Sequence, residues 1–356
     1  MTVPRPNFGH LERMTDEHGT FEHADHSSPR KEHGYCTDDM ARVLLVTSRE
    51  PDPSALVSEL ARKALRFVVE AQGVTGDCCN RRDSSGHWRG AHSVGDCWGR
   101  SLLGLGTAAA RSPYDLVRQV ALAHFERGAQ QRSPWPRAMA FAALGAYEVL
   151  TVRPGASPAL DLLDAAVKVV GHRVKGAHWP WPEARLSYAN AALPDSMMAA
   201  GEALGRPRLV DEGLDLLGWL LDHETNDGHL SVTPVGGSGP EDPRPAFDQQ
   251  PIEVAALADA CARAATLADE DRWVTGIDRA AAWFLGDNDA QALMWDPDSG
   301  GGYDGLRADG ANLNQGAEST LALISTFQHA SRLAVARMDK QAEAAQGGRF
   351  EVPSQS

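Results

Sequence analysis

The sequence has few of the features that mark secreted, membrane-spanning or nucleic-acid-binding proteins. Its 356 residues include five cysteines, a small and odd number that does not suggest a disulfide framework. No apolar run approaches the roughly 18–20 residues that cross a bilayer. Residues 1–6 also lack the apolar core of a secretory signal. We therefore expect a protein of the reduced cytoplasm with no membrane contact.

Positive charge is also scarce. The chain has 34 Lys and Arg residues against 48 Asp and Glu residues, which gives a formal net charge of -14. Binding to a nucleic-acid backbone depends on clustered Lys and Arg, so the charge argues against a nucleic-acid partner.

A repeated helical start is the clearest pattern that the sequence does contain. In six places, polar, aromatic or charged residues run straight into small apolar residues typical of a buried helix. These places begin at Gly34, Gly95, Ser133, Asn190, Phe247 and Asn314. Polar groups at the end of a buried helix are costly unless they face a shared cavity. The pattern predicts a ring of six inner helices around one polar pocket.

Amphipathic segments separate these starts and predict six outer helices, each with one face in water. They cover residues 54–72, 113–129, 157–174, 207–223, 270–286 and 329–346. The connections from outer to inner helices are long and should carry function. They cover residues 73–94, 175–187, 224–247 and 287–313.

Together these features predict an all-α fold, an (α/α)6 toroid with long loops and short strand pieces at the pocket mouth. We expect residues 1–344 to form a single catalytic domain and residues 345–356 to form a flexible polar tail. Gly104 and Gly106 have part of a dinucleotide-binding spacing, but they fall within a helical stretch. We interpret them as sites of close helix packing.

Several motifs carry a resemblance to known proteins. They are Gly34–Asp39 (GYCTDD), Trp181–Glu183 (WPE), Tyr188–Ala191 (YANA), Phe247–Glu253 (FDQQPIE) and Asn314–Thr320 (NQGAEST). With the alternating helices, they resemble the six-hairpin glycosidase-like superfamily over about residues 8–335. The amino-acid sequences of these motifs resemble those of a bacterial family whose members occur beside or fused to glycosyltransferases. The resemblance implies carbohydrate chemistry and a glycosyltransferase partner.

Carboxylates at the helix starts and in the long loops are the candidates for catalysis. Glycoside hydrolysis needs one carboxylic acid to protonate the leaving oxygen and a second carboxylate as base or nucleophile. The candidates are Glu183, Asp248, Asp39, Asp96 and Glu318. We expect Glu183 and Asp248 to be the pair, with Glu183 as the proton donor because tryptophans precede it. Acids in a first helical turn can also simply complement the helix dipole.

Aromatic, polar and basic side chains near the same positions are candidates for sugar binding. Indole rings stack on the C–H faces of sugars, and hydroxyl groups need polar partners. The candidates are His23, His33, Asp38, Trp88, Trp98, Arg100, Trp135, Arg137, Trp181, Asn190, Gln249, Gln250, Glu253 and Asn314. The tryptophans can alternatively pack the loops, and the arginines can form ordinary ion pairs.

These residues leave several functions open. The leading hypothesis is a glycoside hydrolase that acts on a small oligosaccharide or glycoside. A glycoside phosphorylase, a sugar epimerase or isomerase, and a non-catalytic carbohydrate-binding partner of a glycosyltransferase are the alternatives. The histidines and cysteines lack the spacings of a recognised metal site, so we expect neither a metal nor another cofactor.

Overall fold

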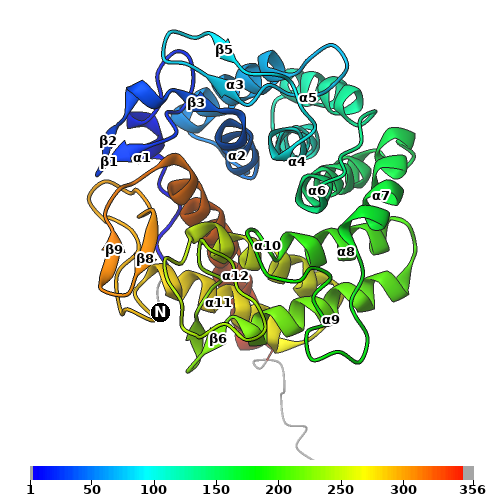
Figure 1. Ribbon diagram of the computed structural model, residues 1–356, viewed down its shortest axis with the longest axis vertical. Helices are drawn as coiled ribbons and strands as arrows, with labels where there is room; N and C mark the ends of the chain where they lie inside the picture. Colours follow the sequence, from blue (N-terminus) through cyan, green and yellow to red (C-terminus); the bar gives the residue numbers. More distant parts are fainter. Residues whose placement is uncertain (1–2, 348–356) are drawn as a thin grey trace, which may run out of the picture.

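The computed structural model describes the backbone of residues 3–347 and the side chains of residues 3–339. Within this range the chain contains twelve α-helices and only short strands. Six helices form a closed inner ring in which each packs against the next and the last packs against the first (Figure 1). They are α2 (Thr37–Ser48), α4 (Asp96–Arg111), α6 (Pro136–Val152), α8 (Ala192–Ala203), α10 (Pro251–Leu267) and α12 (Ala317–Gly347).

Five long helices surround this ring and alternate with the inner helices along the chain (Figure 1). They are α3 (Ala55–Ala71), α5 (Asp115–Gly128), α7 (Ser157–Val170), α9 (Pro207–His223) and α11 (Asp271–Phe284). The arrangement is the predicted (α/α)6 toroid. Five of the six predicted outer segments are confirmed to within a few residues.

The sixth predicted outer helix, 329–346, is wrong as a separate element. It is the continuation of α12, which runs unbroken from Ala317 to Gly347. No Gly or Pro interrupts the sequence between those ends, so nothing breaks the helix there. The short helix α1 (Gly9–Arg13) packs on α12 instead. Of the predicted tail, residues 345–347 belong to α12 and residues 348–356 lie outside the described residues.

The strands form four small antiparallel sheets in the N-terminal segment and in three of the long loops. Their bounds are β1 (Ala24–Asp25), β2 (Ser28–Pro29), β3 (Tyr35–Cys36), β4 (Arg81–Arg82), β5 (Trp88–Arg89), β6 (Thr225–Asn226), β7 (His229–Leu230), β8 (Gly305–Arg307) and β9 (Gly310–Asn312). A single 3-10 turn, η1, covers Lys31–His33. The expected strand pieces are therefore present in the loops that lead to the inner helices.

Close helix packing explains the glycines of α4. A Cβ atom on Gly106 would lie 2.2 Å from the backbone oxygen of Gly145 in α6, and one on Gly104 would lie 2.7 Å from the backbone oxygen of Ala41 in α2. Only glycine allows backbones to approach so closely. This confirms the packing role expected for these positions.

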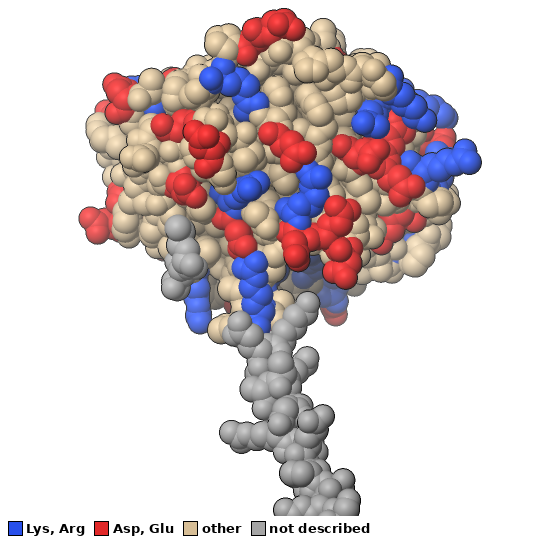
Figure 2. All heavy atoms as spheres, turned by 90° about the horizontal axis from the view of Figure 1, so that it is seen from below, with Lys and Arg blue, Asp and Glu red and all other residues tan. Residues whose placement is uncertain are grey.

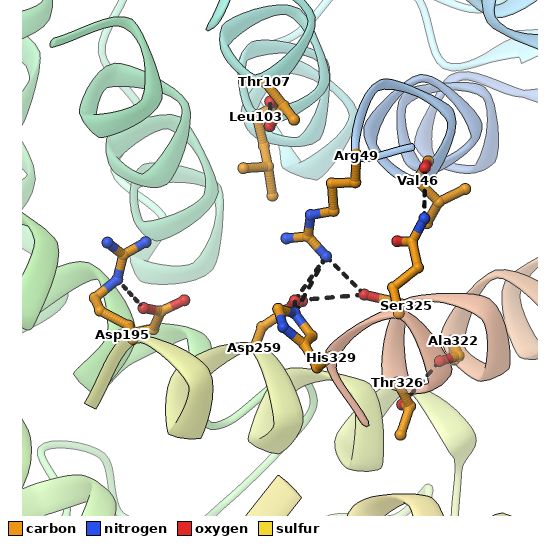
Figure 3. A network of polar contacts seen from close by, with 12 residues as sticks. Val46, Arg49, Leu103, Thr107, Asp195, Asp259, Ala322, Ser325, Thr326 and His329 are labelled. Carbon is orange, nitrogen blue, oxygen red and sulfur yellow. Dashed lines mark hydrogen bonds and ion pairs between the residues drawn. The ribbon is translucent and has the colours of Figure 1, made fainter. Parts of the chain in front are cut away.

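A charged cluster joins the C-terminal end of α2 to the middle of α10 and to the first half of α12 (Figure 3). Arg49 Nη1 lies 2.8 Å from Asp259 Oδ1 and 2.8 Å from Ser325 Oγ. His329 Nε2 lies 2.6 Å from the same Asp259 oxygen. We call these four residues the far-end cluster.

The outer surface carries charges of both signs. Figure 2 shows acidic and basic side chains intermixed on the face seen from below. Among the described helices, none has the length and apolar character needed to cross a bilayer.

Candidate active site

A cavity of about 430 Å³ opens at the N-terminal ends of the inner helices, where the sequence predicted a pocket. We call it the acid cavity because six carboxylates line it. They are Glu22, Asp38, Asp39, Asp96, Asp304 and Glu318. Four of these acids lie in the first turn of α2, α4 or α12. The other two come from the N-terminal segment and from the loop before β8.

Arg42 joins two of these acids across the ring. Its Nη1 lies 2.6 Å from Asp39 Oδ1 in the same helix, and its Nη2 lies 2.5 Å from Glu318 Oε2 in α12. The arginine therefore links the first inner helix to the last. Charge-assisted contacts of this length fix both carboxylates relative to each other.

Asp39 has the electrostatics of a proton donor. Burial raises its pKa to about 6, the nearby Arg42 guanidinium opposes the rise, and the negative charge of Glu318 adds to it. The Cys36 thiol donates a hydrogen bond to Asp39 Oδ2 at 3.1 Å. A carboxyl with a pKa near the working pH can both give and regain a proton.

Tyr188 forms part of the wall opposite α2 and α12. Its hydroxyl donates to Asp96 Oδ2 at 2.7 Å, and burial together with Asp96 raises the pKa of the phenol, so it stays a donor. The Arg137 guanidinium lies 5.1 Å from the centre of the Tyr188 ring and donates to the Tyr188 carbonyl. Arg137 also contacts Glu183 Oε1 at 2.7 Å.

A buried network holds the loop that carries Tyr188. The carboxyl of Glu253 accepts hydrogen bonds from the backbone N–H of Ala189 and, at 3.1 and 3.0 Å, from the backbone and side chain of Asn190. Ala189 adopts a positive φ of 45°, which three such bonds help to maintain. Glu253 and Asn190 therefore position the cavity wall and do not face a ligand.

The expected catalytic pair is not in the acid cavity. Glu183 is ion-paired with Arg137, so the apolar setting expected from its tryptophan neighbours also contains a guanidinium. Asp248 is exposed, its backbone carbonyl accepts a hydrogen bond from the Val235 N–H at 2.8 Å, and its Cβ lies near Gly305. Neither Glu183 nor Asp248 is among the residues that line the cavity.

The other sequence candidates separate into three groups. The acid cavity contains four acids expected from the sequence together with three other candidates: Asp38, Asp39, Asp96, Glu318, His23, Arg100 and Gln250. Packed into the protein are Trp98, Trp181, Arg137, Asn190, Gln249 and Glu253. Outside the cavity lie His33, Trp88, Trp135 and Asn314.

The buried tryptophans do not fit a stacking role. Trp98 is fully buried and its indole N–H donates to the Gly128 carbonyl at 3.1 Å, so its substrate-binding assignment is corrected to a core role. Trp181 packs beside Trp219 with ring centres 6.0 Å apart. Trp135 is 63% exposed at the start of α6, on the same end of the ring as the cavity.

Sequence reasoning missed Glu22 and Asp304. Both lie in irregular segments with no helical periodicity to indicate where their side chains point. Asp304 Oδ1 accepts from the Gly316 N–H at 2.8 Å and from the Ser319 hydroxyl at 2.6 Å, which ties the β8 loop to α12. The His-rich character of the N-terminal segment was the available signal for Glu22, through its neighbour His23.

A second depression adjoins the acid cavity and shares Glu22 and His23 with it. This outer hollow measures about 370 Å³ and contains His33, whose ring lies edge-on to His23 with centres 5.1 Å apart. Its remaining lining residues are Glu32, Arg81, Arg82, Asp83 and Arg89.

One group of described side chains has the spacing of metal ligands. Atoms of Glu22, Cys36 and Asp39 lie within 4.8 Å of one another. Arg81 is paired with Glu22 and Arg42 with Asp39, so guanidinium groups already balance both carboxylates. The set therefore does not fit a resident metal ion.

Solved structures of sugar-active enzymes share this architecture. A sugar epimerase from a ruminal bacterium has a TM-score of 0.67 at 11% identity, over 91% of this chain and 95% of that chain. Cellobiose 2-epimerase from Bacillus thermoamylovorans has a TM-score of 0.65 at 12% identity, over 90% of this chain and 95% of that chain.

An α-1,6-mannanase from Salegentibacter sp. has a TM-score of 0.58 at 10% identity, over 91% of this chain and 96% of that chain. That structure is an inactive variant with two consecutive aspartates replaced by asparagine, in complex with α-1,6-mannotriose. Neither a protein-family model nor a curated protein matches the chain. The protein thus shares the (α/α)6 toroid fold with these enzymes.

Proposed function

We propose that this protein is a glycoside hydrolase that acts on a small oligosaccharide or glycoside in the acid cavity. The observation that carries the proposal is the convergence of six carboxylates on one cavity, with the pKa of Asp39 raised to about 6. Hydrolysis of a glycosidic bond needs a carboxylic acid and a carboxylate on the same substrate, and this cavity offers both.

In this mechanism Asp39 donates its proton to the glycosidic oxygen as the bond from that oxygen to the anomeric carbon breaks. Asp38 is the second carboxylate, and it either takes a proton from the attacking water or bonds to the anomeric carbon. Its side chain is 18% exposed and lines the cavity. Asp38 and Asp39 are also the only Asp-Asp pair in the sequence.

The test is release of reducing sugar from mannosides, glucosides and galactosides, with and without inorganic phosphate. Asp39→Asn and Asp38→Asn should each lower kcat by about 10²–10⁴, because each removes a group that moves a proton or electron pair. Asp248→Asn is the matched control, because Asp248 is an exposed aspartate outside the cavity. Near-normal turnover by Asp39→Asn, or a large loss in Asp248→Asn, would overturn the assignment and restore the pair first expected from the sequence.

Phosphorolysis is disfavoured by charge. The acid cavity contains six carboxylates against two arginines, and Arg42 is already paired with two of those acids. A phosphate ion would enter a negative field. Turnover that requires inorganic phosphate would show that phosphorolysis is the reaction.

Epimerisation is the second candidate, and His23 is the observation in its favour. This histidine lines the acid cavity with its Nε2 3.7 Å from Glu22 Oε1, and the two epimerases share the fold. Among the residues lining the cavity it is the only histidine. Proton exchange at C2 of glucose, mannose or cellobiose in deuterated water, detected by NMR, would identify an epimerase.

A glycosyltransferase partner remains a prediction from the sequence motifs. If the protein is only a sugar-binding partner, it will bind sugars without any turnover, and Asp39→Asn will leave binding unchanged. Co-purification with a glycosyltransferase expressed from a neighbouring gene would test the association itself.

A further inference from the structure

Arg100 is the one arginine of the acid cavity whose guanidinium forms no hydrogen bond with any described residue. It lies in the second turn of α4, and its side chain is only 9% exposed. The guanidinium stacks on the Phe141 ring of α6, with its central carbon 3.9 Å from the ring centre. Arg42, by contrast, donates to two carboxylates.

The nearest acid does not satisfy Arg100. Asp38 Oδ1 lies 3.7 Å from Arg100 Nε, beyond hydrogen-bond distance, and that oxygen is itself buried with no hydrogen-bond partner among the described residues. The Arg100 guanidinium borders the cavity and has no hydrogen-bond acceptor among the described residues, so a ligand in the cavity can supply the missing acceptors. Stacking on Phe141 holds the guanidinium plane fixed and leaves its N–H groups free to donate within that plane.

The charges around Arg100 limit the kind of ligand. Asp38, Glu318 and Asp96 favour its charged form, whereas burial and the neighbouring Arg42 lower its pKa. Three acids therefore already balance two arginines at this point. A phosphate or carboxylate on the ligand would be repelled by those acids, but uncharged hydroxyl groups would not.

The space beyond Arg100 limits the size of the ligand. A deeper cavity, lined in part by Phe141, continues toward the far-end cluster, and Arg100 lines both cavities. This deep cavity measures only about 70 Å³, and aliphatic side chains such as Leu45, Leu103 and Leu321 line it. A cavity of about 150 Å³ holds one benzene molecule. The deep cavity therefore has no room for a further sugar, so a sugar at Arg100 is the end of its chain.

We propose that Arg100 binds two adjacent hydroxyl oxygens of an uncharged terminal sugar, which makes the enzyme exo-acting on neutral glycans. The inference shares one premise with the proposed function, namely that the acid cavity binds a sugar. Arg100 is a substrate-binding residue here, and the proton transfers remain with Asp38 and Asp39.

Binding can be tested separately from turnover. Isothermal titration with methyl mannoside, methyl glucoside and methyl galactoside, and with the corresponding uronic acids and 6-phosphates, identifies the preferred sugar on the unmodified protein. Arg100→Gln should bind that neutral sugar about 10- to 100-fold more weakly, the usual loss for a charge-assisted pair of hydrogen bonds. Arg100→Lys keeps the charge but not the planar pair of donors, so it should recover only part of the affinity.

The matched control is Arg153→Gln. Arg153 is an exposed arginine directly after the C-terminal end of α6. Circular dichroism checks folding, and Arg100→Lys keeps the test decisive if Arg100→Gln does not fold. Unchanged affinity in the Arg100 variants, tighter binding of the acidic sugars, or no binding of any neutral sugar by the parent would overturn the inference. Binding that depends on Arg100 without hydrolysis would contradict the proposed function alone, and hydrolysis insensitive to Arg100 would contradict this inference alone.

Discussion

At the scale of single residues, the acids of the cavity differ in what surrounds them. Asp39 is buried beside Arg42 and the Cys36 thiol, whereas Glu318 is 42% exposed on its side chain. Both carboxyls contact Arg42, but their surroundings differ. Such differences allow one carboxyl to carry a proton while others in the same cavity do not.

The pKa of Asp39 predicts how activity depends on pH. A general acid works in its protonated form, so kcat should fall as the pH rises through about 6, the pKa to which burial raises Asp39. The hydrogen bond from the Cys36 thiol favours the charged carboxylate and thereby lowers the pKa of Asp39. Removal of the thiol should raise that pKa. Cys36→Ala should therefore move the alkaline limb of the pH profile to higher pH.

Cys36→Ser is the comparison variant because a hydroxyl can still donate to Asp39 and accept from its backbone N–H. Cys261→Ala controls for loss of a buried thiol elsewhere, in α10. An alkaline limb that stays in place in Cys36→Ala, or moves to lower pH, would show that Asp39 is not the acid being titrated.

At the scale of elements, the far-end cluster joins three inner helices at residues that do not line the acid cavity. Arg49 and His329 hold the pKa of Asp259 well below its usual range although burial acts to raise it. The Asp259 side chain is 25% exposed. The ion pair contributes stability at neutral pH without contacting the proposed substrate.

Asp259→Asn should lower the free energy of unfolding at pH 7 by up to about 3–5 kcal/mol, the cost of leaving a mostly buried partner unpaired. The folded-state pKa is depressed, so this stability is fully present above the unfolded value of about 3.9 and is lost progressively as the pH falls from there through the folded-state pKa. Urea unfolding should thus show a difference from the parent at pH 7 that becomes smaller at pH 3, where the folded-state carboxyl is still ionised.

Asp278→Asn is the matched control, since Asp278 pairs with Arg337 at the surface with both side chains nearly half exposed. Its effect should stay below about 1 kcal/mol. Equal losses in the two variants, or a loss in Asp259→Asn that is as large at pH 3 as at pH 7, would contradict the role assigned to the cluster.

Helices and loops differ in how far the sequence determines them. The apolar periodicity and the polar helix starts predicted the ring, its open end and four acids of the cavity, because a residue in the first turn of an inner helix has a defined direction. Glu183 and Asp248 lie in irregular loops, where neighbouring residue types do not determine where a side chain points. Glu22 and Asp304 escaped prediction for the same reason.

At the scale of the whole molecule, we predict that neither the fold nor the proposed activity depends on a metal. The one group with ligand spacing, Glu22, Cys36 and Asp39, is balanced by two arginines. Incubation with EDTA followed by gel filtration should leave both the melting temperature and the hydrolytic rate unchanged within error. A large loss that zinc or calcium restores would show that these three residues hold an ion.

Arg42 and Glu318 are 276 positions apart in the sequence, and their contact closes the ring between the first inner helix and the last. Glu318, which helps to raise the pKa of the proposed acid Asp39, is therefore contributed by the other end of the chain. Folding must bring those ends together before the site exists, which is a long-range step that costs chain entropy. Activity consequently depends on closure of the whole ring. A mutation that separates α2 from α12 should abolish activity while most of the helices remain intact.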